Sequence, residues 1–167
     1  MSKFAVHLVA DLEPKTDIVG QVSVYVPSLE LFSGPFARDA VTFPLCNGNQ
    51  VTIDQLKSGA GPAPKNCYCG IFMLDPFLNW GNLAELLHAA KFKGICNFPP
   101  LPDFDGEEER ALFASEYSFE KEMTQIKNYA GDAFEMLISY SNDEQHKSAR
   151  ELLAGSNGRF CHVDSIR

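Results

Sequence analysis

The sequence has no cluster of basic residues, and its acidic side chains outnumber its basic ones. Of 167 residues, 22 are Asp or Glu and 14 are Lys or Arg, which gives a formal net charge of −8. A surface of that sign repels the phosphates of nucleic acids and the headgroups of anionic lipids. We therefore expect neither a nucleic acid nor a membrane among the partners of this protein.

The sequence also lacks a long hydrophobic run. A membrane-spanning helix needs about 20 predominantly apolar residues, and the apolar run near the amino terminus is short and meets Asp11 and Glu13 at once. We interpret that run as the first strand of the fold and not as a signal peptide. A chain with five cysteines and no targeting signal is expected to be cytoplasmic, with its thiols reduced.

Several motifs that mark enzyme classes are missing. There is no Gly-x-Ser-x-Gly elbow, no P-loop and no Gly-x-Gly-x-x-Gly after a strand, so none of those three enzyme classes is indicated. Cys67 and Cys69 lie within one expected strand and lack the turn that separates the paired ligands of a zinc site. Buried cysteine, acting as a small hydrophobic residue, is the better interpretation of this pair.

The chain does have the composition of one folded domain. Hydrophobic residues make up 45% and charged residues 22%, which are ordinary values, so residues 1–167 are expected to form a single domain. From residue 66 onward, strand and helix patterns alternate with short loops, which is typical of a parallel α/β sheet with right-handed crossovers. Strands are expected at 67–74, 95–98, 134–140 and 159–166, and helices at 78–91, 117–129 and 143–153, with Gly94 as the stop after the first helix.

The first 64 residues are less regular. The runs at 4–12 and 18–26 have strand composition, and no helix separates them, so we expect a hairpin or two neighbouring strands joined by a tight loop. Residues 28–64 indicate a long excursion over one end of the sheet, with a short helix at 51–57 that Thr52 or Asp54 caps. The whole chain then has about six strands and three clear helices.

A series of short motifs follows the strand and helix order between residues 66 and 162. In chain order they are Asp-Pro-Phe at 75–77, Gly94, Asn-Phe-Pro at 97–99, Asp-Gly at 105–106, then Tyr117, Glu120, Glu122 and Met123, and Cys-His at 161–162. This series resembles the central segment of the phosphoenolpyruvate hydrolase-like family, also described as TIM-barrel signal-transduction proteins. The resemblance implies descent from a parallel eight-stranded barrel.

The chain departs from that family in ways that bear on its fold. The family's glycine-rich first loop has no counterpart here, and the sequence ends after what corresponds to the sixth strand. The resemblance therefore implies an α/β fold with a truncated TIM-barrel-like parallel sheet of about six strands. Six strands leave two edges bare, so we expect either an open sheet or a homo-oligomer, such as a homodimer, that completes it.

Polar residues at the expected strand ends form the candidate site. The carboxyl ends of parallel strands meet at one edge of a sheet, where ligands bind. A carboxylate, an amide and an imidazole at that edge can bind a divalent metal or move a proton beside a small carboxylate substrate. The simpler interpretation is that Asp75 and Asn97 hydrogen-bond the backbone of their own proline turns. The predicted ligand-binding residues are Asp75, Phe77, Asn97, Ser141 and His162.

Two functions from different classes remain open. The first is a non-catalytic or regulatory descendant of the family, which binds a small ligand or a protein partner; the lost loop and strands favour it. The second is a metal-assisted lyase or hydrolase acting on a small carboxylate or enol-phosphate. In that enzyme, Asp75 and Glu120 hold a divalent metal such as Mg²⁺. The catalytic residues are Asp75, Asn97, which orients the substrate, and His162, which moves a proton.

Overall fold

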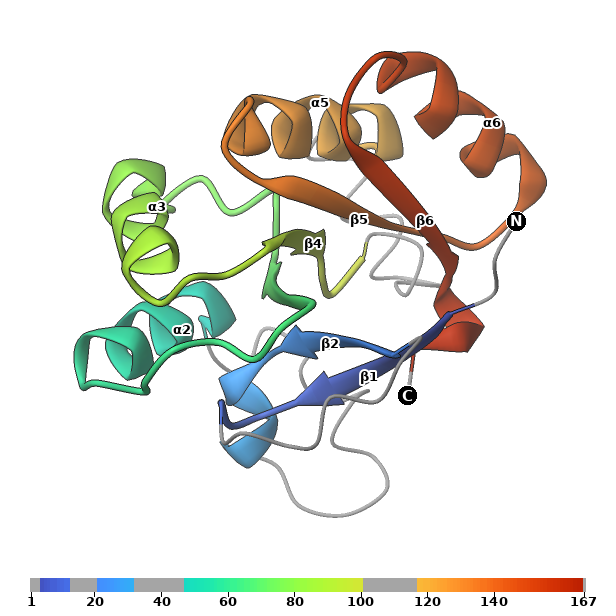
Figure 1. The fold of residues 1–167 in the computed structure, drawn as a ribbon. Helices are drawn as coiled ribbons and strands as arrows, with labels where there is room; N and C mark the ends of the chain where they lie inside the picture. Colours follow the sequence, from blue (N-terminus) through green and yellow to red (C-terminus); the bar gives the residue numbers. More distant parts are fainter. Residues whose placement is uncertain (1–3, 13–20, 32–46, 101–116, 167) are drawn as a thin grey trace.

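The structure is a curled, six-stranded, all-parallel sheet with helices on one face. It is a computed structural model that describes residues 4–12, 21–31, 47–100 and 117–166. The strands lie side by side in chain order, and each pairs in parallel with the next (Figure 1). The predicted α/β class, with a truncated TIM-barrel-like parallel sheet of about six strands, is confirmed. The strands are β1 (Ala5–Val9), β2 (Gln21–Tyr25), β3 (Cys67–Ile71), β4 (Gly94–Asn97), β5 (Glu135–Tyr140) and β6 (Gly158–His162).

Among the described residues, four α-helices pack on one face of the sheet (Figure 1). Each follows an Asn or Ser whose side chain accepts a backbone N–H three residues on, which satisfies a free donor of the first turn. Asn47 has this role in α2, so the expected caps Thr52 and Asp54 are wrong; both lie inside the helix. The helices are α2 (Gly48–Lys57), α3 (Trp80–Ala89), α5 (Phe119–Ala130) and α6 (Asp143–Leu152), and the 3-10 helices are η1 (Pro27–Leu31) and η3 (Val163–Ser165).

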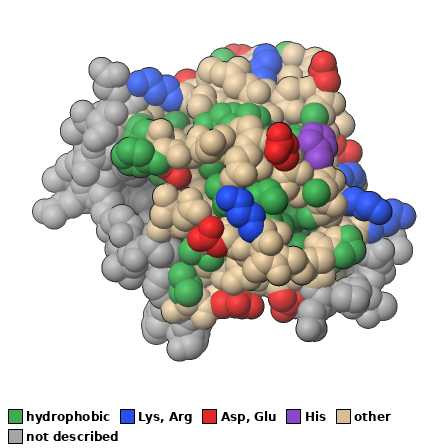
Figure 2. All heavy atoms as spheres, turned by 90° about the vertical axis from the view of Figure 1, so that its left-hand side faces the viewer, with side chains coloured by type: hydrophobic (Ala, Val, Ile, Leu, Met, Phe, Trp, Pro, Cys, Tyr) green, Lys and Arg blue, Asp and Glu red, His purple; other side chains and the backbone are tan. Residues whose placement is uncertain are grey.

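These helices are short and amphipathic. Within the described segments, no helix has the length and the apolar character that crossing a membrane requires. Figure 2 shows the side of the molecule that lies on the left in Figure 1, where acidic, basic and hydrophobic side chains are interspersed.

Alternate residues along the strands contribute to two hydrophobic clusters. Cys67, Cys69 and Ile71 of β3 face the helices and pack with the apolar sides of α3 and α5. Tyr68 points the opposite way, into the concave side of the sheet. No member of this inner cluster is more than 6% exposed. Its members are Val6, Val22, Val24, Val26, Tyr68, Cys96, Phe98, Leu137, Cys161 and Ile166.

The first two strands are neighbours, as expected, but they do not form a hairpin. β1 and β2 pair in parallel, from Ala5 with Gln21 to Val9 with Tyr25, whereas the two arms of a hairpin are antiparallel. The sequence pattern misleads here because two strand-like runs with no helix between them look like hairpin arms. The connecting residues 13–20 lie outside the described segments.

Gly94 opens β4 and does not terminate the preceding helix. α3 ends at Ala89 with Ala90 as its C-cap, and Lys91 takes the left-handed backbone conformation with φ of 60°. A Cβ atom on Gly94 would collide with the carbonyl oxygen of Glu135 and with the ring of Tyr68. Glycine is therefore needed at this position for the close approach of β4 to its neighbour β5.

Candidate functional site

The carboxyl ends of the six strands lie at one edge of the sheet because all of the strands are parallel. We call this the carboxyl edge and define it by residues 72–77, 97–98, 139–142 and 162–164, which follow or end β3 to β6, together with the start of α2 at 47–49. Every ligand-binding residue predicted from the sequence lies within it. The motif at 105–106 and residues 32–46 of the predicted excursion lie outside the described residues.

Asp75 braces the turn that follows β3. Its Oδ1 accepts the backbone N–H of Phe77 at 2.9 Å, and its Oδ2 accepts a hydrogen from the side-chain amide of Asn49 at 3.0 Å. The same amide donates to the carbonyl of Phe72 and accepts the N–H of Phe72, both at 3.0 Å. Asp75 thus closes its own turn, and Asn49 fastens that turn to α2.

Asn49 is a residue that the sequence reasoning missed. It lies in the run Cys-Asn-Gly-Asn, which reads as a turn, yet it is the second residue of α2 and is only 4% exposed. Its side chain makes the hydrogen bonds that a further strand residue would make with Phe72. The signal in the sequence was faint, because Asn47, the N-cap two residues earlier, accounts for an Asn-rich helix start on its own.

Phe77 is the most exposed large hydrophobic side chain in the described segments, at 88%. Its backbone is held by Asp75, and Pro76 precedes it, so the turn that presents the ring is braced. Isolated surface hydrophobics are common, but this ring lies at the carboxyl edge. Phe77 was predicted to touch a ligand, and its position is compatible with that role.

Asn97 lies at the centre of a buried polar cluster. Its Oδ1 accepts the backbone N–H of Ser139 at 2.7 Å, and its Nδ2 donates to the carbonyl of Ser139 at 3.3 Å. The same Nδ2 donates to Oε2 of Glu122 on α5 at 3.2 Å. All three residues are fully buried. A side-chain amide thus continues the β4–β5 pairing and holds a carboxylate beneath the helix.

The structure buries Glu122 and exposes Glu120. Glu122 is 0% exposed and belongs to the buried stripe of α5 with Phe119 and Ile126, whereas Glu120 lies on the solvent side. The helical spacing from Phe119 to Ile126 could have identified Glu122 as the inward-facing carboxylate. Among the described residues, no three His, Cys, Asp or Glu side chains gather closely enough to hold a metal ion.

His162 is fixed by both of its ring nitrogens. Nδ1 accepts the backbone N–H of Asp164 at 3.3 Å and lies 3.4 Å from the carboxylate of that residue. Nε2 lies 2.8 Å from the carbonyl oxygen of Ser141, so the tautomer with hydrogen on Nε2 satisfies both contacts. The predicted residues Ser141 and His162 are therefore brought together, through the backbone of Ser141. Its N–H and hydroxyl both donate to Oε1 of Gln145 at 2.9 Å.

His146 on α6 packs against aromatic rings of β5 and β6. Its ring stacks on Tyr140, with centroids 4.4 Å apart and planes 8° apart, and it lies 5.4 Å from the ring of Phe160. The rings of His162 and Tyr140 form a T-shaped contact with their centroids 5.5 Å apart. The two histidines thus flank one tyrosine at the end of β5.

The four described cysteines are buried, free thiols, as predicted for Cys67 and Cys69. Burial raises the pKa of the Cys67 thiol to about 12 and that of the Cys161 thiol to about 11. The pKa values of Cys69 and Cys96 are also raised by burial. Protonated thiols are poor nucleophiles and poor metal ligands, so these side chains act as packing groups.

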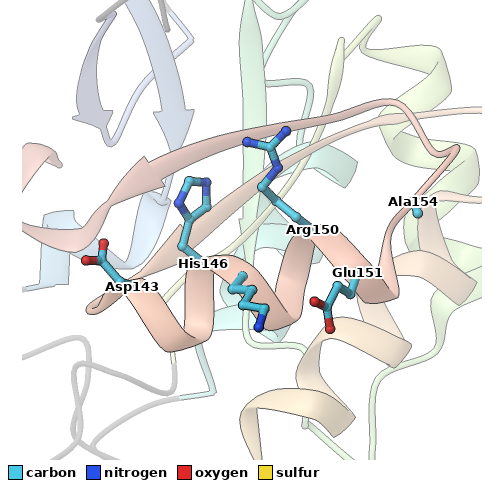
Figure 3. Close-up of a pocket in the computed structure, with 6 residues that line it drawn as sticks. Asp143, His146, Arg150, Glu151 and Ala154 are labelled. Atoms are coloured by element: carbon cyan, nitrogen blue, oxygen red, sulfur yellow. The ribbon is translucent and has the colours of Figure 1, made fainter.

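A surface hollow runs along α6, away from the predicted site. Its lining residues lie on α6 except Ala154, which follows the end of that helix. Figure 3 shows His146 and Arg150 on one side of the helix and Glu151 on the other. Lys147 and Arg150 lie between Asp143 and Glu151 along it, so it has no charge of one sign to attract a particular ligand. None of the predicted site residues lines this hollow.

The predicted site residues divide into separate hydrogen-bonded groups. Asp75 and Phe77 belong with Asn49, Asn97 belongs with Ser139 and Glu122, and Ser141 belongs with His162. No hydrogen bond or ion pair between described residues joins Asp75 to Asn97 or to His162. Each group ties together parts of the fold that lie far apart in the sequence.

Comparison with known proteins does not assign this chain to a family. No protein-family model matches the chain. The chain is 26% identical over 121 residues to a protein of Sinorhizobium fredii (strain NBRC 101917 / NGR234) that bears the name "Uncharacterized protein y4oT". The match covers 72% of this chain and 61% of that protein.

Proposed function

We propose that this chain is a non-catalytic binding protein, descended from phosphoenolpyruvate hydrolase-like TIM-barrel proteins, which engages a protein partner at its carboxyl edge. The six-stranded parallel sheet and the ordered motifs of residues 75–77, 97–99 and 161–162 support this descent. We keep a homo-oligomer and a cytoplasmic location as predictions. Light scattering of the purified 18.5 kDa chain tests the first of these.

One observation carries the proposal: the polar groups that would perform chemistry are used to hold the protein together. Both carboxylate oxygens of Asp75 accept hydrogen bonds from protein groups. The side-chain oxygen and nitrogen of Asn97 also form hydrogen bonds within the protein. Both ring nitrogens of His162 do so as well. These hydrogen bonds orient each group toward the protein, whereas a general base or a metal ligand must be oriented toward its substrate or ion.

Phe77 favours a protein partner over a small ligand. Small molecules usually bind in concave sites that enclose most of their surface, whereas this ring projects outward with 88% of its area exposed. Exposed aromatic residues on braced backbone serve as anchors in protein interfaces, because little conformational entropy is lost when they are covered. We therefore assign the contact with the partner to Phe77.

The test compares capture by three forms of the immobilised protein. The wild type, Phe77→Ser and Leu152→Ser are each exposed to a lysate of the source cells, and bound proteins are quantified by mass spectrometry. Leu152 is a matched control, since it is also an exposed hydrophobic residue, at 38%, but lies on α6. We expect one protein to be captured in equal amounts by the wild type and by Leu152→Ser. The amount captured by Phe77→Ser should be at least tenfold lower. Equal binding to all three forms would refute the role of Phe77.

A second candidate, a metal-assisted lyase or hydrolase acting on a small carboxylate or enol-phosphate, is favoured by Glu122. This carboxylate is fully buried at the end of β4 beside the amide of Asn97, and buried carboxylates are frequent in active sites. A thermal-shift panel of Mg²⁺, Mn²⁺ and small phosphorylated or carboxylic acids tests it. Stabilisation of the wild type that disappears in both Asp75→Ala and Glu122→Gln would favour the enzyme, because a ligand raises Tm only by binding the native state.

A further inference from the structure

The two edges of the sheet are brought together by the residues that follow β6. After His162, the chain turns through η3, and Ile166 then forms an isolated parallel bridge with Val6 of β1. Figure 1 shows η3 beside the start of β1, at the end of the sheet where the curl returns on itself. The first and last strands are thus connected by main-chain pairing, although they lie at opposite ends of the strand order.

The bridged residues are buried in the same hydrophobic cluster. Val6 is 0% and Ile166 is 1% exposed, and both belong to the inner cluster on the concave side. Val163, the first residue of η3, is 7% exposed. The segment that crosses from β6 to β1 therefore covers apolar side chains that an open six-stranded sheet would leave facing water.

His162 sets the direction of this segment. Its Nδ1 caps η3 by accepting the N–H of Asp164, and its Nε2 hydrogen bonds to the carbonyl of Ser141 in the neighbouring turn after β5. The N–H of Ile166 then donates to the carbonyl of Val163 at 3.1 Å, which completes the turn. A single side chain thus holds the 3-10 turn against the turn that follows β5.

We propose that residues 163–166 are a latch that closes the curled sheet onto itself, and that His162 positions this latch. The sequence argument for a second copy of the chain was the unpaired edge that a six-stranded sheet leaves. The latch pairs with that edge at Val6 of β1. The inference is independent of the proposed binding role.

A designed disulfide tests the pairing directly. Parallel neighbours lie about 4.8 Å apart, which falls within the Cα separation that a disulfide accepts, and both side chains point into the inner cluster. In the double variant Val6→Cys with Ile166→Cys, we expect mild oxidation to form this bond, with loss of two hydrogens, and peptide mapping to locate it. Free thiols at both positions after oxidation of the folded variant would overturn the latch.

Hydrogen exchange of a single variant gives a second, independent readout. Ile166→Ala should raise the exchange rates of the β1 amides at least tenfold, while the amides of β3 and β4 change less than twofold. Leu152→Ala, an exposed position on α6, serves as the matched control and should leave β1 unchanged. His162→Ala should reproduce the effect of Ile166→Ala, because the latch loses the hydrogen bonds of His162 to Ser141 and Asp164. Equal effects on β1, β3 and β4, or no effect on any of them, would contradict the proposal.

Discussion

The side-chain amide of Asn97 pairs with the main chain of Ser139 as a further rung of the β4–β5 ladder. Its oxygen accepts the N–H at 2.7 Å, and its nitrogen donates to the carbonyl at 3.3 Å and to Glu122 at 3.2 Å. Removal of the amide deletes its hydrogen bonds to three buried polar groups. We expect Asn97→Ala to lower the free energy of unfolding by about 2–4 kcal/mol.

Trp80 provides the measurement for that prediction. It is the only tryptophan in the sequence and stacks on Tyr129 with ring centroids 4.6 Å apart, so its fluorescence should report the loss of helix packing during urea unfolding. Asn128→Ala on the exposed side of α5 is the matched control and should change stability by less than about 0.5 kcal/mol. An unchanged urea midpoint for Asn97→Ala would show that the cluster is not structural.

Two glycine substitutions should act in opposite directions. Gly94→Ala places a methyl group against the carbonyl oxygen of Glu135 and the ring of Tyr68. We therefore expect the free energy of unfolding to fall by more than about 3 kcal/mol, or the chain to fail to fold. Gly81→Ala lies in α3, where the new methyl group meets only ordinary contacts, and should raise stability by up to about 1 kcal/mol. Thermal melts monitored by circular dichroism measure both. A stable Gly94→Ala variant would contradict the close approach of β4 and β5.

The buried thiols make the fold sensitive to alkali. The pKa of Cys161 rises to about 11 and that of Cys67 to about 12, from an ordinary value of 9.0, because of burial. Between these values the unfolded chain releases protons that the native state keeps, so stability is full below pH 9 and falls as the pH rises from 9 towards 11 or 12. Each thiol contributes a loss of up to about 1.4 kcal/mol per pH unit.

Urea unfolding at several pH values between 8 and 10 measures this effect. We expect a falling free energy of unfolding above pH 9 and a smaller slope in Cys161→Ala, which has one buried thiol fewer. Alkylation of the native protein at pH 8 should spare Cys67, Cys69, Cys96 and Cys161 in a peptide map. A flat profile from pH 8 to 10 would show that these thiols ionise as readily in the folded chain as in the unfolded one.

The sequence was sufficient for the fold and for the positions of the candidate residues, but not for their roles. Buried strand runs and the helical spacing of Leu83 and Leu87 are local signals, so the alternating α/β order could be predicted. The partners of the polar residues are separated by long stretches of chain: Asn49 lies 26 residues from Asp75, and Asn97 lies 42 residues from Ser139. Such pairings depend on strand register and on where a helix begins, which no local pattern specifies.

Short stretches of sequence could not decide between the two arrangements that were open for the first two strands, a hairpin or two neighbouring strands. The parallel direction of β2 is set by its pairing with both β1 and β3. A local pattern does not specify tertiary contacts of this kind.

The central claim is that polar side chains at the carboxyl edge brace the scaffold and do not carry chemistry. Active-site residues are commonly held at a cost to stability, so their replacement leaves stability unchanged or raises it. The urea-unfolding free energy of Asp75→Ala distinguishes the two cases most directly. The account predicts a loss of about 1–2 kcal/mol, because the N–H of Phe77 and the amide of Asn49 lose their acceptor. A variant as stable as the wild type, or more stable, would contradict it.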